Sequence, residues 1–113
     1  MDIQLFMPQI TILNLSGLTI QTADSYRPIL YQIHSAGQDW MHACGGKGRC
    51  TTCKCIVASG MENISLPSAP EQRYQAQGAL KTDERLACQA IAHGDVEIVV
   101  PELSKLPHLT YSF

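Results

Sequence analysis

Cys44-Gly-Gly-Lys-Gly-Arg-Cys50-Thr-Thr-Cys53 is a cysteine-rich stretch that holds three of the chain's five cysteines. A fourth cysteine, Cys88, lies much further along the chain, within Arg85-Leu-Ala-Cys-Gln89. Three thiolates on a glycine-containing loop can wrap around one inorganic centre, and a fourth from a distant segment completes its coordination shell. The pattern therefore indicates an iron–sulfur cluster site and, with it, one-electron transfer.

The other residues of this loop suit such a site. Sulfur atoms of a cluster carry negative charge, so the loop around them should turn backbone N–H groups inward, as a nest. This geometry often requires a positive φ, which Gly45, Gly46 and Gly48 adopt without Cβ strain. Lys47 and Arg49 add positive charge. They either raise the reduction potential or lie at the surface, where isolated charges contribute little.

Two residues beside the loop, Cys55 and His42, could have a functional role, but each also has a simpler structural interpretation. Cys55 follows Cys53 by two positions, so on a strand the two share a face. A buried small apolar residue is the better interpretation of Cys55, because free cysteines are commonly buried. His42 precedes the loop and either tunes the cluster or is a structural residue, as many titratable groups are.

Trp40 and Arg85 are interpreted as structural residues. Trp40 is expected to pack against the core and to serve as a fluorescence reporter that a bound cluster quenches. Arg85, close to the fourth cysteine, should pair with an acid that fixes its segment. The candidates are Glu62, Glu71 and Glu84.

Strand-like stretches with β-branched or alternating residues lie in both halves of the chain. They predict strands at residues 9–15, 18–22, 54–59 and 95–100. Ser16-Gly17 should join the first two strands as a hairpin with a two-residue connection.

Two helices are predicted as well. The first is capped by Asp24 or Ser25, continues for about three turns and ends at Gly37. Its apolar face is formed by Tyr26, Ile29, Leu30 and Ile33. A short second helix should span residues 71–79 after a loop at 61–70. This element order predicts an α+β fold, a small mixed sheet with one principal helix.

Length and composition fit a single small domain over residues 1–113. The net charge of −2 and the lack of a basic stripe exclude nucleic acid as a partner. No apolar run is long enough to cross a bilayer, and the N-terminal residues lack a secretory signal pattern, so we expect a cytoplasmic location. We also expect a monomer. No nucleophile–base pair, phosphate loop or nucleotide fingerprint is present in the sequence, which predicts a carrier and not an enzyme.

Other uses of the cysteines compete with a cluster. A secreted disulfide framework would suit an even number of cysteines and a signal sequence, and neither is present. Structural zinc sites usually pair two short Cys-x2-Cys units, whereas only Cys50 and Cys53 form one here. A zinc-stapled interaction module and a redox-sensing module remain the alternatives to an electron carrier.

The spacing Cys-x5-Cys-x2-Cys, followed by Arg-Leu-Ala-Cys-Gln, resembles that of the adrenodoxin-like, vertebrate-type 2Fe-2S ferredoxins, in particular their bacterial members. The likeness runs from about Gln9 to the C-terminus. It implies a β-grasp fold and a soluble one-electron carrier with one 2Fe-2S cluster. It also implies that the four ligands are Cys44, Cys50, Cys53 and Cys88.

The resemblance implies partners too. An NAD(P)H-dependent flavoprotein, a ferredoxin reductase, would donate the electron. A redox acceptor protein would receive it: a haem monooxygenase, another oxygenase or the iron–sulfur assembly machinery. Docking should be transient, through a small interface around residues 45–49. The adrenodoxin branch has an acidic docking helix before the fourth cysteine, whereas residues 62–84 of this chain also contain Arg73 and Lys81. This difference argues against partners of the steroid-hydroxylase type.

Overall fold

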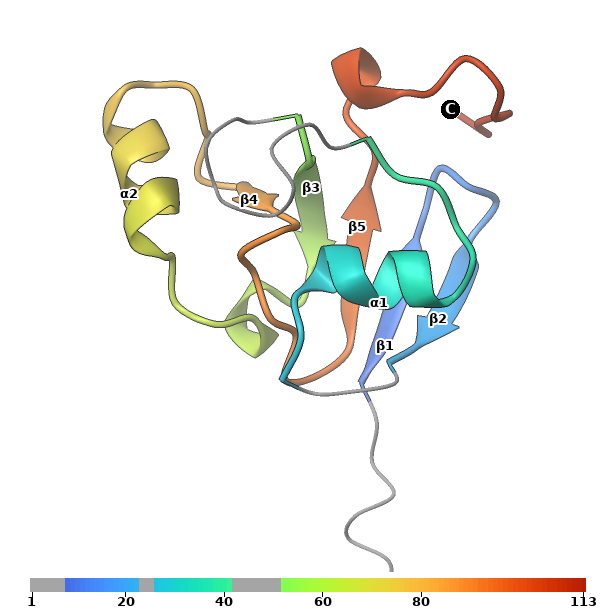
Figure 1. Ribbon diagram of the computed structural model, residues 1–113, viewed down its shortest axis with the longest axis horizontal. Helices are drawn as coiled ribbons and strands as arrows, with labels where there is room; N and C mark the ends of the chain where they lie inside the picture. The colour runs from blue at the N-terminus through green and yellow to red at the C-terminus, as the bar shows by residue number, and fades with distance from the viewer. Residues whose placement is uncertain (1–7, 23–25, 42–51) are drawn as a thin grey trace, which may run out of the picture.

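The structure, a computed structural model, describes residues 8–22, 26–41 and 52–113 of the chain. Within these residues a five-stranded sheet forms the centre of the fold, with strand order β2-β1-β5-β3-β4 (Figure 1). β1 pairs antiparallel with β2 and parallel with β5, and β3 pairs antiparallel with both β4 and β5. The predicted mixed sheet is therefore confirmed. The strands are β1 Gln9–Ile12, β2 Leu18–Gln21, β3 Lys54–Ser59, β4 Glu84–Leu86 and β5 Val96–Val99.

Helix α1, Ile29–Ser35, lies across one face of this sheet, and α2, Ala69–Ala76, lies beside β4 (Figure 1). Ile29, Leu30 and Ile33 of α1 are buried. They belong to one apolar cluster with alternate residues of the strands, among them Ile10 and Ile98. The core therefore lies between α1 and the sheet, as the apolar periodicity of these segments predicts.

The first hairpin is confirmed, but its predicted two-residue connection is wrong. β1 ends at Ile12, and residues 13–17 form the turn. Asn14 leaves the strand because its side chain bonds to the backbone of Val100, from Nδ2 to O at 3.0 Å and from the Val100 N–H to Oδ1 at 2.9 Å. Ser16 and Gly17 then take positive φ angles of 58° and 70°. A long-range contact thus set the length of a local turn.

The first helix is shorter than predicted. It begins after Pro28, and Tyr26 is 85% exposed and so does not contribute to its apolar face. The N–H groups of Ile29 and Leu30 donate to the carbonyls of Ala90 and Ala87, each at 2.8 Å. Because these carbonyls satisfy helix N–H groups that have no partner within the helix, they fix where α1 begins. The predicted caps Asp24 and Ser25 lie outside the described residues.

The second helix begins two residues earlier than predicted, at Ala69. Ser68 and Glu71 form a reciprocal capping box, and Pro70 occupies the first turn, where it is tolerated. The strand β3 has the predicted bounds, Lys54–Ser59. The short strand β4 and the 3-10 turns η2 Met61–Asn63 and η3 Glu102–Ser104 were not predicted.

The C-terminal segment, residues 101–113, folds back onto the body of the protein. The N–H of Ser112 donates to the carbonyl of Asn14 at 3.0 Å, and Tyr111 packs against the core. The packing of this segment is partial, because Leu103 and Phe113 are 95% and 65% exposed.

Replacing Gly60 by alanine is expected to destabilise the protein strongly. Gly60 has a φ of +89°, and a Cβ there would lie 2.5 Å from the carbonyl oxygen of Asp95 and 2.9 Å from Cα of Val96. Both atoms belong to the backbone, so the clash could be relieved only by shifting the main chain. We expect Gly60→Ala to lower the free energy of unfolding by about 3 kcal/mol or more.

Gly37→Ala is the matched control, because Gly37 has a φ of +84° but no atom within 4 Å of an added Cβ. It should cost only the backbone strain, about 1 kcal/mol. Urea unfolding followed by circular dichroism measures both. Equal losses for the two variants would contradict the proposed steric origin of the effect.

Candidate metal centre

Two of the four predicted ligands, Cys53 and Cys88, are described, and the fold brings them together. Cys53 directly precedes β3 and Cys88 closely follows β4. The antiparallel pairing of Lys54 with Leu86 places these two segments side by side. Cys53 and Cys88 are 1% and 5% exposed, and their thiols are hydrogen-bonded to each other. Cys44 and Cys50, the other predicted ligands, lie outside the described part of the chain.

The chemistry of this thiol pair suits a metal. The hydrogen bond with Cys88, together with burial, raises the pKa of Cys53 well above its ordinary value. The sulfur of Cys53 is therefore a neutral thiol when no cation is near. Thiolate is the form that binds metal, so ligation here must release protons. Two buried thiols that converge in this way fit an iron–sulfur centre.

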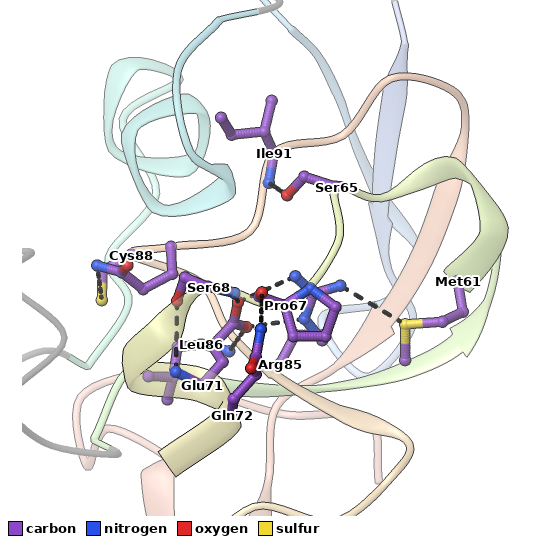
Figure 2. A network of polar contacts seen from close by, with 11 residues as sticks. Met61, Ser65, Pro67, Ser68, Glu71, Gln72, Arg85, Leu86, Cys88 and Ile91 are labelled. Carbon is purple, nitrogen blue, oxygen red and sulfur yellow. Dashed lines mark hydrogen bonds and ion pairs between the residues drawn. The ribbon is translucent and has the colours of Figure 1, made fainter. Parts of the chain in front are cut away.

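The backbone around the two cysteines is held from several sides. The carbonyl of Cys53 accepts hydrogen bonds from Nε1 of Trp40 at 3.1 Å and from the N–H of Ala87 at 3.2 Å. Nε2 of Gln89 lies 3.8 Å from Sγ of Cys88 and can donate a hydrogen bond to it (Figure 2). Donors of this kind stabilise negative charge on sulfur. The predicted packing role of Trp40 is confirmed, as it is 4% exposed and part of the core.

Cys55 is buried, as predicted. It lies on β3 and is fully buried, and burial raises the pKa of its thiol to about 12. In the antiparallel pairing of β3 with β4, Cys55 lies opposite Arg85. That Cys55 is not a ligand stays a prediction.

Arg85 pairs with Glu71, one of the three acids predicted for it (Figure 2). Nε and Nη2 of Arg85 donate to Oε2 and Oε1 of Glu71 at 2.7 and 3.0 Å, so the ion pair is bidentate. Glu71 also accepts from the N–H groups of Ser68 and Leu86, both at 2.9 Å. Nη1 of Arg85 lies 3.9 Å from Sδ of Met61. This network ties the start of α2 to β4, two residues before Cys88.

Burial alone would raise the pKa of Glu71, but its hydrogen bonds act against that. The side chain of Arg85 and the N–H groups of Ser68 and Leu86 stabilise the carboxylate, and together they lower the pKa below the ordinary value of 4.5. Glu71 is thus ionised at neutral pH although it is fully buried. Glu84, another predicted candidate, instead accepts from the N–H of Lys81 at 2.7 Å.

Several sequence-predicted residues lie outside the described ranges, namely His42, Lys47, Arg49 and the loop glycines. The hydrogen bonds of Trp40 and Gln89 to the cysteine segments were not predicted. The position of Gln89 next to Cys88 was a usable signal, because a side chain adjacent to a ligand can reach its sulfur. For Trp40 the sequence holds no signal, since Cys53 is thirteen positions away.

Among the described residues, no group of three or more potential metal ligands comes together. Two of the four predicted cysteines are not among those residues. No helix in the described part of the chain has the length and apolar character needed to span a membrane.

Comparison with known proteins identifies the family of this chain. The family model for the 2Fe-2S iron–sulfur cluster binding domain matches residues 12–93. The 2Fe-2S ferredoxin-5 of Aquifex aeolicus is 31% identical over 100 residues, which is 83% of this chain and 97% of that protein. The crystal structure of the ISC-like 2Fe-2S ferredoxin FdxB from Pseudomonas putida superposes with a TM-score of 0.70 and 30% identity, over 92% of this chain and all of that one.

A longer protein contains the same fold. A ferredoxin reductase in carbazole 1,9a-dioxygenase has a TM-score of 0.61 and 26% identity with this chain, covering 92% of this chain but only 31% of the reductase. The chain belongs to the family of 2Fe-2S iron–sulfur cluster binding domains. This membership confirms three predictions, the ferredoxin β-grasp fold, the 2Fe-2S cofactor and the function of an iron–sulfur electron carrier.

Replacing Glu71 by glutamine is expected to lower the free energy of unfolding by about 3–5 kcal/mol, because it leaves the charge of buried Arg85 without its partner. Glu102→Gln is the control, since Glu102 forms a 3.0 Å ion pair with Lys105 but its own side chain is 84% exposed. That change should cost about 1 kcal/mol or less. Thermal unfolding of both iron-loaded variants measures the difference. A loss no larger for Glu71→Gln than for Glu102→Gln would contradict a stabilising role of the pair.

The stability that Glu71 contributes should depend on pH. Its pKa is lowered by folding, so the contribution is complete above the ordinary value of 4.5 and is lost as the pH falls through the lower folded value. The difference in unfolding free energy between wild type and Glu71→Gln should therefore be constant near neutral pH and narrow below about 4.5. Urea unfolding at several pH values between about 7 and 3 measures this difference. A difference that widens towards low pH would contradict the assignment.

Proposed function

We propose that Cys44, Cys50, Cys53 and Cys88 together hold the 2Fe-2S cluster and that the chain uses it as a one-electron carrier. The observation that carries this proposal is the convergence of the buried thiols of Cys53 and Cys88, in a chain whose family binds this cluster. When bound, the cluster supplies a site that takes up and releases one electron.

The residues of the chain that surround these two thiols hold them and shield them. β3 and β4 fix the spacing of Cys53 and Cys88, and the near-complete burial of both excludes water from their sulfurs. Gln89 donates toward the sulfur of Cys88. A hydrogen bond to sulfur favours the reduced state, since it offsets added negative charge. The chain is thus built as a carrier and not as an enzyme.

The finer family assignment, an adrenodoxin-like ferredoxin of the bacterial type, is also a proposal. It is supported by the cysteine spacing and by the segment Arg85–Gln89. The acidic docking helix of the adrenodoxin branch has no counterpart here, because Glu71 on α2 is buried and forms an internal ion pair with Arg85. Exposed charges near α2 are mixed, with Glu62 and Asp83 accompanied by Arg73 and Lys81.

We propose an NAD(P)H-dependent flavoprotein reductase as electron donor. The occurrence of this fold within a longer ferredoxin reductase supports that partner class. The acceptor is proposed to be a haem monooxygenase, another oxygenase or the iron–sulfur assembly machinery. Because α2 offers no acidic surface, both partners should dock transiently near residues 45–49 beside the cluster. The free thiols of Cys53, Cys55 and Cys88 suit a reducing, cytoplasmic compartment, and we propose a monomer there.

Cys88→Ala and Cys55→Ala test the ligand set as a matched pair. Both remove a buried thiol from neighbouring segments, but only Cys88 is proposed to bind iron. Cys88→Ala should lose the visible absorbance and the iron and acid-labile sulfide. Cys55→Ala should keep all three, with iron and sulfide in equal amounts, and an electron paramagnetic resonance signal after reduction with dithionite.

The opposite pattern, with the cluster kept in Cys88→Ala and lost in Cys55→Ala, would refute the proposed ligands. Zinc in place of iron in anaerobically purified wild type would instead support the zinc-stapled module. An iron-loaded protein that a reductase cannot reduce would argue for a redox sensor.

A further inference from the structure

Trp40 makes a contact that packing alone does not require. Its indole is 4% exposed, and its Nε1 donates to the carbonyl of Cys53 at 3.1 Å across a buried region. The two residues are thirteen positions apart, on opposite sides of the cysteine-rich loop. The bond therefore connects the entry of that loop to the third of the proposed ligands.

The same carbonyl already has a partner. It accepts from the N–H of Ala87 at 3.2 Å, which continues the ladder between β3 and β4 beyond the Lys54–Leu86 pair. Because this bond satisfies the carbonyl, strand pairing does not depend on the indole. The bond from Trp40 uses the second lone pair, which a buried carbonyl can leave without a partner at modest cost.

Ala87 links this junction to the fourth proposed ligand. It directly precedes Cys88, and its own carbonyl accepts from the N–H of Leu30 at the start of α1. The Cys53 carbonyl is thus a point where the residue before the loop, the third ligand and the segment of the fourth ligand meet. A change in the position of this peptide would move one sulfur relative to the other.

We propose that Trp40 is a positioning residue for the cluster, acting through its indole N–H on the carbonyl of Cys53. The inference rests on the proposed ligand set. The N–H dipole offsets the negative end of the carbonyl close to the ligand sulfur and holds that peptide in place. Its removal should make the reduction potential more negative, because uncompensated negative charge disfavours the reduced cluster. It should also accelerate loss of the cluster.

Two replacements separate the N–H from the volume of the ring. Trp40→Phe removes the donor but also shrinks the side chain. Trp40 is the single tryptophan of the chain, so biosynthetic replacement of tryptophan by benzothienylalanine changes this position alone. That analogue keeps the bicyclic shape and lacks the N–H. Tyr111→Phe is the control, because the hydrogen bond that it removes, from the N–H of Leu106 to the Tyr111 hydroxyl, involves neither Trp40 nor a cysteine.

The experiment compares iron-loaded wild type, both Trp40 replacements and Tyr111→Phe by redox titration and by the rate of absorbance loss in a chelator. Both Trp40 replacements should have a more negative potential and lose the cluster about fivefold faster, the factor expected for one ordinary hydrogen bond. Tyr111→Phe should match wild type in both. The benzothienylalanine protein keeps the shape of the ring, so it gives the decisive result if Trp40→Phe fails to fold.

A benzothienylalanine protein with the potential and the chelation rate of wild type would overturn the inference and leave the proposed function standing. If wild type itself contains no iron after reconstitution, the ligand set fails and this inference fails with it. Equal shifts in Tyr111→Phe and in the Trp40 replacements would also overturn it, because the effect would then not depend on the Cys53 carbonyl.

Discussion

The buried ion pair of Glu71 and Arg85 is the constraint on which the second half of the molecule depends. Arg85 is 2% exposed, and a charge at such depth is tolerated only with a partner and with its hydrogen bonds satisfied. Glu71 meets both conditions, and it accepts from the N–H of Leu86 as well. It can do so only if α2 begins at Ala69 and β4 lies directly beside it. One polar pair therefore orients two elements that have little apolar surface of their own.

The consequence reaches the proposed ligands through backbone pairing. β4 is only three residues long, yet it sets the position of Cys88 because it pairs with β3, which follows Cys53. The start of α1 adds a second restraint, since its first N–H groups are bonded to the carbonyls of Ala87 and Ala90 on either side of Cys88. Cys88 is thus held by a helix, a strand and an ion-pair network, and each acts through backbone or buried polar groups.

The internal use of Glu71 also bears on recognition. A helix before the fourth cysteine that directed its acids outward would offer a negative docking surface, but α2 directs its glutamate inward. Helix α2 therefore offers no acidic surface that would attract a strongly basic partner. This is why the proposed docking falls on the residues beside the cluster, where an electron has the shortest path and a small, transient interface is sufficient.

The sequence by itself determined the chemistry of the protein and the elements with a strong local pattern. The cysteine pattern predicted an iron–sulfur cluster, and the resemblance to the 2Fe-2S ferredoxins specified its type. The strand β3 was predicted to the residue because alternation and a following glycine act within a few positions. Tertiary structure alone decided the five-residue turn after β1, the late start of α1 and the existence of β4. Asn14 reaches Val100, Ile29 and Leu30 reach Ala90 and Ala87, and Glu71 reaches Arg85. Hydrogen bonds between residues so far apart leave no periodic trace in the sequence, so the choice of Glu71 among three possible acids became visible only in the folded chain.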